Sequence, residues 1–264
     1  MRGYLLNVTL IFLIVVWPLL VAGQKKNESF QLSIAKTNAP PQVDGDDDDA
    51  VWKECAVAKD FFMVLPMDTS SAQLKTEVRM TYDQNNLYIV ATCYHGGWEY
   101  MVESLRRDWA FLRNDNFIFF MDPFDDQTNG FTFGANAAGA QWDGTLYEGG
   151  KADLSWDNKW VSETKYYSDR WVFEAAIPFK SLRYKKGITQ WGINFSRLDL
   201  RTTEKSSWTP VPRQFPTASL AYTGVLAWDQ APPEPGGNVS LIPYALGRAS
   251  KDYQNNQKIH QQLS

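Results

Sequence analysis

Residues 73–82 alternate between polar and largely apolar side chains, position by position. One set of alternate positions holds Leu74, Thr76, Val78, Met80 and Tyr82. A period of two residues predicts a β-strand that buries one face. Residues 83–86 are typical of a turn, and residues 87–94 follow as a mostly apolar run. The pair predicts a hairpin whose second strand is central in a sheet.

Other short runs have the same extended character. Residues 117–121 are continuously apolar, which suits a strand buried on both faces, and Asn129-Gly130 is typical of a hairpin turn. Residues 171–177 alternate again, as do residues 191–195. The phase of this last strand then slips, so we expect a β-bulge near Ser196.

Helical patterns are few. One short helix is expected after Asp46–Asp49, where acidic residues favour a helix start, and a second at residues 98–107. Many short strands with frequent turns indicate a fold built from sheets alone. We therefore predict an all-β fold, a jelly-roll-like antiparallel β-sandwich with one or two short helices.

The composition excludes several other classes of protein. With 44% hydrophobic and 14% aromatic residues, the chain can bury a core and is not a disordered protein. Lys and Arg number 26 against 30 Asp and Glu, so no basic excess exists to bind nucleic acid. Only two cysteines are present, which excludes a disulfide scaffold.

The N-terminus has the order of a secretory signal peptide, residues 1–23. Arg2 gives a positive start, residues 5–20 are mainly apolar, and residues 21–23 are small. The apolar run is shorter than the roughly 20 residues of a transmembrane helix, and an uncleaved anchor is the alternative. We expect an exported protein, located in the periplasm, in the outer membrane or outside the cell.

The rest of the chain divides by composition. Residues 24–42 are expected to form an N-terminal leader with the first strand, and residues 43–228 the β-sandwich. Residues 229–238 are rich in Pro and Gly, as linkers are. Residues 239–264 are too short to fold alone, and we expect them to begin a truncated C-terminal domain.

Cys55 and Cys93 leave two possibilities open. Export would permit a disulfide between them. Cys93 lies in a predicted core strand, where a buried free thiol is equally ordinary.

Several ordered motifs carry a resemblance to a known family. Val43-Asp44-Gly45 followed by Asp49-Ala50-Val51-Trp52 resembles the entry motif of family-9 carbohydrate-binding modules. A bacterial exported subgroup, in which the module precedes an outer-membrane-type β-barrel of undefined function, is similar over about residues 43–226. The motifs of this subgroup include Arg106-Arg107-Asp108, Asp122-Pro123-Phe124-Asp125-Asp126, Gln141-Trp142-Asp143-Gly144, Trp156-Asp157, Ile177-Pro178-Phe179 and Trp191-Gly192-Ile193-Asn194-Phe195.

The resemblance implies an oligo- or polysaccharide as partner, bound through exposed tryptophans. Sugar-binding members clamp the sugar between two Trp side chains. Trp208 matches the later of these positions, whereas the earlier one falls on Leu112, with Trp109 nearby. The resemblance also implies a covalent C-terminal outer-membrane barrel, whose first strand would lie in residues 239–264.

The subgroup's polar residues suggest a second way to bind saccharide. These residues are expected near strand ends, where they could bind sugar hydroxyls or an acidic sugar, since Arg favours carboxylates. The alternative is that Arg106 and Arg107 pair with Asp108 and Asp115 to brace a loop. The set comprises Arg106, Arg107, Asn136, Gln141 and Asp143.

One acidic turn is a candidate calcium site. Asp122, Asp125, Asp126 and Asn129 offer oxygen ligands in a single turn, and family-9 modules can carry structural calcium. A plain hairpin turn is the alternative. We expect no other cofactor.

No catalytic motif is present. His95 and His260 lack a recognisable nucleophile motif nearby, and no phosphate-binding loop occurs. We predict a non-catalytic carbohydrate-binding module associated with carbohydrate breakdown or uptake. The alternatives are an accessory domain of an outer-membrane β-barrel without sugar binding, and a hydrolase acting on O-glycosyl bonds.

Overall fold

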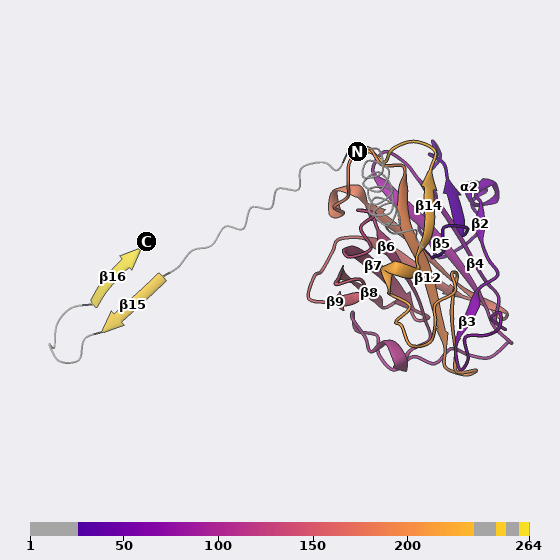
Figure 1. The fold of residues 1–264 in the computed structure, drawn as a ribbon. Coiled ribbons are helices and arrows are strands. Elements are labelled where there is room, and N and C mark those ends of the chain that lie inside the picture. Colours follow the sequence, from indigo (N-terminus) through magenta and orange to yellow (C-terminus); the bar gives the residue numbers. More distant parts are fainter. Residues whose placement is uncertain (1–25, 235–246, 252–258, 264) are drawn as a thin grey trace, which may run out of the picture.

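The computed structural model describes residues 26–234, 247–251 and 259–263. Two β-sheets pack face to face as a sandwich (Figure 1), which confirms the predicted all-β fold. The helical elements are short: α2 (Ala50–Glu54) and the 3₁₀ turns η2 (Phe111–Arg113), η3 (Phe179–Ser181) and η4 (Leu220–Tyr222). Within the described ranges, no helix is both long and apolar enough to span a membrane.

The larger sheet has nine strands. Seven of them follow in the order β1 (Gln31–Ile34), β14 (Gly224–Trp228), β12 (Gln190–Asp199), β6 (Asn116–Asp122), β7 (Gly130–Asn136), β8 (Gln141–Tyr147) and β9 (Lys151–Asp153). The other two continue from β12, which pairs with β13 (Glu204–Ser207), which in turn pairs with β3 (Phe62–Leu65). The predicted turn at Asn129-Gly130 does join two antiparallel strands, β6 and β7.

The smaller sheet has five strands. Their order is β10 (Val161–Tyr166), β11 (Arg170–Pro178), β5 (Asn86–Tyr94), β4 (Thr76–Tyr82) and β2 (Val57–Ala58). The predicted hairpin is β4 and β5, and β5 is central, between β4 and β11. A separate antiparallel pair consists of β15 (Gly247–Lys251) and β16 (Ile259–Leu263).

Aromatic side chains fill the space between the two sheets. The rings of Phe117 on β6 and Phe173 on β11 lie 5.8 Å apart, so they join one sheet to the other. Phe195 on β12 stacks on Phe117 at 6.1 Å. All three side chains are fully buried, and side chains of this size contribute most of the apolar area that stabilises a core.

The larger sheet is buried on its outer face as well. Ile118 and Phe120 of β6 point away from the main core and join a second cluster with Trp109 and Trp142. The predicted bulge near Ser196 is wrong, because β12 pairs with β6 without a register shift. Loops cover the outer face of the larger sheet, so β12 can carry apolar residues on both of its faces. The change in its alternation of apolar residues therefore needs no bulge.

The short helix predicted after Asp46–Asp49 is confirmed as α2, whereas residues 98–107 do not form a helix. The backbone N–H of Met101 donates to Asp115 Oδ2 at 2.7 Å, and the N–H of Glu103 donates to Asn114 Oδ1 at 2.9 Å. These side-chain acceptors take the place of the backbone carbonyls that a helix would use.

Both ends of the sandwich domain include residues outside the predicted 43–228. Strand β1 lies beside β14 and pairs with it in parallel (Figure 1), an exception to the expected antiparallel arrangement. Asp229, in the predicted linker, accepts hydrogen bonds from the Lys36 N–H and the Tyr82 hydroxyl. The predicted signal peptide and residues 235–238 lie outside the described residues.

Candidate functional site

Three of the five predicted polar residues meet at one end of the larger sheet. Gln141 begins β8 and Asp143 follows on the same strand, while Arg107 lies in the long loop between β5 and β6. Arg107 Nη1 donates to Gln141 Oε1 at 2.9 Å, and Nη2 donates to the Asp143 carboxylate. These three side chains therefore lie together.

Further contacts occupy the guanidinium of Arg107. Its Nη2 donates to the Asn158 carbonyl at 3.0 Å, and its Nε lies 3.2 Å from Asp157 Oδ1. The Arg107 side chain is 33% exposed, and Asp157 is 75% exposed. Because most of its N–H groups are used within the protein, Arg107 has little capacity left for a ligand.

Asp143 is the buried partner in this cluster. Burial raises the pKa of its carboxyl, and the Asn158 N–H and Arg107 oppose that rise. The predicted pairing with Asp108 and Asp115 is wrong, because Arg107 pairs with Asp143 and Asp157 instead.

The two other members of the polar set do not join the cluster. Asn136 is fully buried: its Nδ2 donates to the Ser104 carbonyl at 2.7 Å and its Oδ1 accepts from the Ala140 N–H at 2.9 Å. Arg106 is exposed, and its side chain makes no hydrogen bond or ion pair in the part of the chain that the structure describes. Asn136 therefore holds a turn, and Arg106 faces solvent.

The expectation of exposed tryptophans is wrong at both predicted positions. Trp109 and Trp208 are each 4% exposed. Trp109 packs against Trp142 at 6.3 Å and donates its Nε1–H to a backbone carbonyl. Trp208 is covered by Phe30 from the leader, with ring centroids 6.0 Å apart. Leu112 is 67% exposed but has no aromatic face, so these residues form no open clamp.

The acidic turn uses its oxygens to hold its own backbone. Asp122 accepts from the Gln127 N–H at 2.8 Å, and Asp126 accepts from the Asn129 N–H at 2.8 Å. Asp125 lies in the same turn with a positive φ of 58°. Within residues that the structure describes, no group of three or more His, Cys, Asp or Glu side chains is placed to hold a metal ion.

Cys55 and Cys93 are both free thiols, so the disulfide alternative is wrong. Cys93 lies fully buried on β5, and burial raises its pKa to about 12. Cys55 follows α2 and donates its thiol to the Val51 carbonyl at 3.2 Å. Cys55 packs against the cluster around Trp52, whereas Cys93 belongs to the main core, so the two thiols lie in different clusters.

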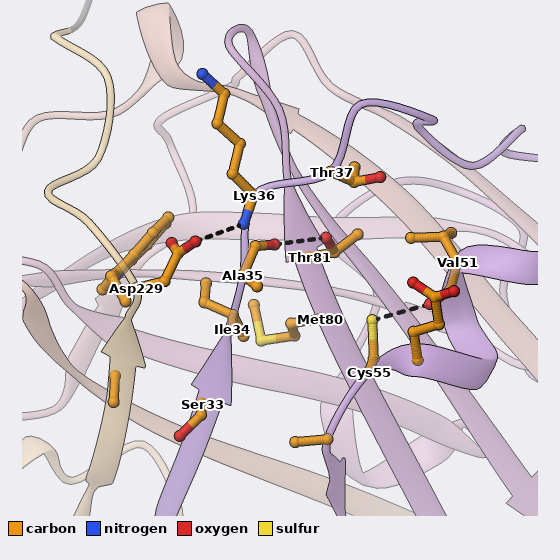
Figure 2. A pocket seen from close by; sticks show the side chains of 14 residues that line it. Ser33, Ile34, Ala35, Lys36, Thr37, Val51, Cys55, Met80, Thr81 and Asp229 are labelled. Carbon is orange, nitrogen blue, oxygen red and sulfur yellow. Dashed lines mark hydrogen bonds between the residues drawn. The ribbon is translucent and has the colours of Figure 1, made fainter.

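Cys55 lines a cavity of about 480 Å³ between β1, β4, α2 and the end of β14 (Figure 2). Its floor is apolar, with Ile34, Met80 and Trp228. Polar groups at its rim are used internally, since Thr81 Oγ1 donates to the Ala35 carbonyl at 2.9 Å (Figure 2). Such a lining suits an apolar group better than a polyhydroxylated one.

Sequence reasoning missed a group of partly exposed aromatic rings at the end of the smaller sheet. His95 and Tyr166 stack with ring centroids 5.0 Å apart, and Tyr100 packs edge-on against Tyr166 at 5.3 Å. Trp98 lies 6.4 Å from His95. We call His95, Trp98, Tyr100 and Tyr166 the aromatic patch. The closely spaced aromatic residues of the segment His95-Gly96-Gly97-Trp98-Glu99-Tyr100 are the sequence feature that could have indicated this patch.

Comparison with known proteins identifies the family to which this fold is similar. A family model described as carbohydrate family 9 binding domain-like matches residues 43–211. No curated protein is similar enough in sequence to match the chain.

Solved structures give the same picture. A family 9 carbohydrate-binding module from Caldicellulosiruptor kristjanssonii, in complex with cellotriose, is 14% identical with a TM-score of 0.56, over 81% of this chain and 100% of that one. Its complex with glucose is similar with a TM-score of 0.53, 15% identity and the same coverage. A candidate carbohydrate-binding protein from Bacteroides uniformis has a TM-score of 0.58 at 13% identity, over 76% of this chain and 98% of that one. At such identities the likeness shows the fold.

Proposed function

The chain belongs to the carbohydrate family 9 binding domain-like proteins, and from that membership we propose that it is an exported, non-catalytic module that binds oligo- or polysaccharide. The observation that carries the proposal is the family match over residues 43–211. That range holds every strand from β2 to β13, so it includes most of both sheets.

The related complexes support a saccharide ligand. Two of the similar structures hold cellotriose and glucose. Surface aromatic rings bind the apolar faces of sugars, and neighbouring polar groups bind their hydroxyls. By the same chemistry, this chain would act in the breakdown or uptake of carbohydrate.

The proposed location rests on the sequence. Residues 1–23 have the pattern of a secretory signal, which would direct the chain to the periplasm, the outer membrane or the outside of the cell. The resemblance to the exported subgroup further suggests a covalent outer-membrane barrel after residue 238. Mass measurement of the chain recovered from the exported fraction would detect loss of residues 1–23.

A specific observation favours a second candidate function, an accessory domain without sugar binding. Trp109 and Trp208 are both buried, so neither matched position offers a ring face to a sugar. On this hypothesis the sandwich is retained as a scaffold beside a barrel.

A glycan-array screen of the purified full chain separates the two functions. Saturable binding of any saccharide, reproduced in solution by a change in tryptophan fluorescence, supports the carbohydrate-binding module. A folded chain that binds no glycan contradicts it and favours the accessory domain.

A further inference from the structure

We propose that the aromatic patch of His95, Trp98, Tyr100 and Tyr166 is the saccharide-binding surface of this chain, and that it takes a neutral oligosaccharide. This inference rests on the proposed function and assigns it to a site away from Trp109 and Trp208. The patch combines rings from two strand ends and one loop.

The rings form one connected surface. Tyr166 ends β10 and lies between His95, which stacks on it with an interplanar angle of 10°, and Tyr100, which meets it edge-on at 72°. Tyr100 is 39% exposed, and Trp98 is half-buried. A sugar ring can therefore reach aromatic C–H and π surface without displacing the core.

Backbone contacts hold the patch in place before any ligand arrives. The His95 N–H donates to the Asp169 carbonyl at 2.8 Å, and the Gly97 N–H donates to His95 Nδ1 at 3.0 Å. The Tyr166 hydroxyl donates to the Trp98 carbonyl. A surface that is already ordered loses less conformational entropy on binding.

Glycine at position 96 sets the place of the Trp98 ring. A Cβ atom on Gly96 would lie 2.0 Å from the ring of Trp98, so the indole rests directly on the glycine backbone. Gly97 adopts a φ of +82°, a left-handed backbone conformation that favours glycine. The two glycines thus position an indole at the surface rather than in the core.

Two polar atoms within the patch lack partners. Trp98 Nε1 and His95 Nε2 are buried and make no hydrogen bond to the part of the chain that the structure describes. Unsatisfied groups of this kind are uncommon in native proteins. Because both atoms are buried, a sugar would contact the exposed ring faces of the patch rather than these two atoms.

The charges around the patch favour a neutral ligand. Glu99 is exposed between Trp98 and Tyr100, and Asp169, which contacts His95 through its backbone, is 59% exposed. The nearby Arg170 is paired with Asp169 at 3.1 Å. A uronic acid would meet the carboxylate of Glu99, which acts on Tyr166, and like charges repel. Uncharged hexose chains carry no such penalty.

Titration of the full chain with four neutral trisaccharides, cellotriose, xylotriose, maltotriose and mannotriose, and with anionic trigalacturonate tests the inference. At least one neutral trisaccharide should bind, and Tyr100→Ala should weaken that binding at least ten-fold. Tyr147→Ala is the matched control, because Tyr147 on β8 is 42% exposed and outside the patch, and it should leave binding unchanged.

The outcomes separate this inference from the proposed function. Binding of a neutral trisaccharide that is equal in the wild type and in Tyr100→Ala overturns the assignment to the patch and leaves the carbohydrate-binding function standing. Tighter binding of trigalacturonate overturns the preference for neutral ligands. If no neutral trisaccharide binds, the inference fails, and only a glycan array without any binding also removes the proposed function.

Discussion

Arg106 and Arg107 show how differently two identical neighbours can be used. Arg107 meets Gln141, Asp143 and Asp157, whereas Arg106 is exposed without a charged partner in the described structure. A buried carboxylate such as Asp143 is strongly dependent on its partner, because an unpaired buried charge is costly. Solvent screens part of the effect here, since Arg107 is 33% exposed.

We therefore expect Arg107→Ala to lower the free energy of unfolding by about 2 kcal/mol. Arg106→Ala, the neighbouring control, should change it by less than about 0.5 kcal/mol. Urea denaturation of both variants checks this. Equal effects of the two substitutions would show that the cluster does not stabilise the fold.

Glu174 binds the entry motif, which consists of Val43-Asp44-Gly45 and Asp49-Ala50-Val51-Trp52. Its carboxylate accepts hydrogen bonds from the Trp52 indole at 3.1 Å, from the Asp44 N–H at 3.0 Å and from the Gly45 N–H at 3.2 Å. One buried side chain on β11 thus holds the whole segment that precedes and forms α2. Burial raises the pKa of Glu174 to about 7.

The raised pKa of Glu174 makes stability depend on pH in a defined direction. The folded chain holds this proton more tightly than the unfolded chain, whose carboxyl has the ordinary value of 4.5. The resulting stabilisation is complete below about pH 4.5 and is lost as the pH rises through about 7. Between pH 5 and pH 8, the free energy of unfolding of the wild type should therefore fall by about 2 kcal/mol more than that of Glu174→Gln.

Urea denaturation at these two pH values measures the effect, with Glu54→Gln on the exposed side of α2 as the control. The same pH dependence in wild type and Glu174→Gln would mean that another group is responsible.

At the scale of elements, the loop between β5 and β6 behaves as a fixed structure. Fully buried Asn114 accepts from the N–H groups of Glu103 and Ser104 at 2.9 and 3.2 Å and donates to the Ala110 carbonyl at 2.9 Å. These hydrogen bonds take the place of the backbone hydrogen bonds that a strand or a helix would supply. A segment held by few side chains opens when one of them is removed.

Asn114→Ala should therefore make the bonds after Arg106, Arg107 and Arg113 several-fold more sensitive to trypsin. Limited digestion followed by mass analysis of the fragments gives the cleavage rates. Asn129→Ala, at an exposed turn, is the control and should digest like wild type. No change in the Asn114 variant would show that the loop is held by other contacts.

At the scale of the whole molecule, the N-terminal leader is part of the fold. The β1 side chains alternate between exposed and buried, and Leu32 and Ile34 enter the core at 1% and 3% exposure. Asn27 donates to the Tyr222 carbonyl at 2.6 Å, and Phe30 covers Trp208. The match to the family model begins at residue 43, so β1 lies outside the matched range.

Leu32→Ala should lower the free energy of unfolding by about 2–5 kcal/mol, because it leaves a cavity in the core. Ser33→Ala on the exposed face of the same strand should stay within about 0.5 kcal/mol of wild type. Comparison of the unfolding midpoints of these two variants tests the prediction. Similar values for both variants would show that β1 does not contribute to the core.

Local pattern was sufficient for the strands and hairpins. The alternation in β4, the apolar run of β6 and the turn at Asn129-Gly130 depend on side chains a few residues apart, and the expected elements are present. The fold class followed, because short strands separated by turns can bury their apolar faces only by stacking in sheets.

Only the tertiary structure decided which aromatic side chains face solvent. The local sequence around a tryptophan is the same whether or not a distant segment covers its ring. Phe30 covers Trp208 from far away in the chain, and Trp142 encloses Trp109, whereas Tyr100 stays open. Burial depends on contacts between residues remote in sequence. The sequence by itself therefore determined the family and the sandwich, and the packing of its loops decided where a ligand can reach an aromatic ring.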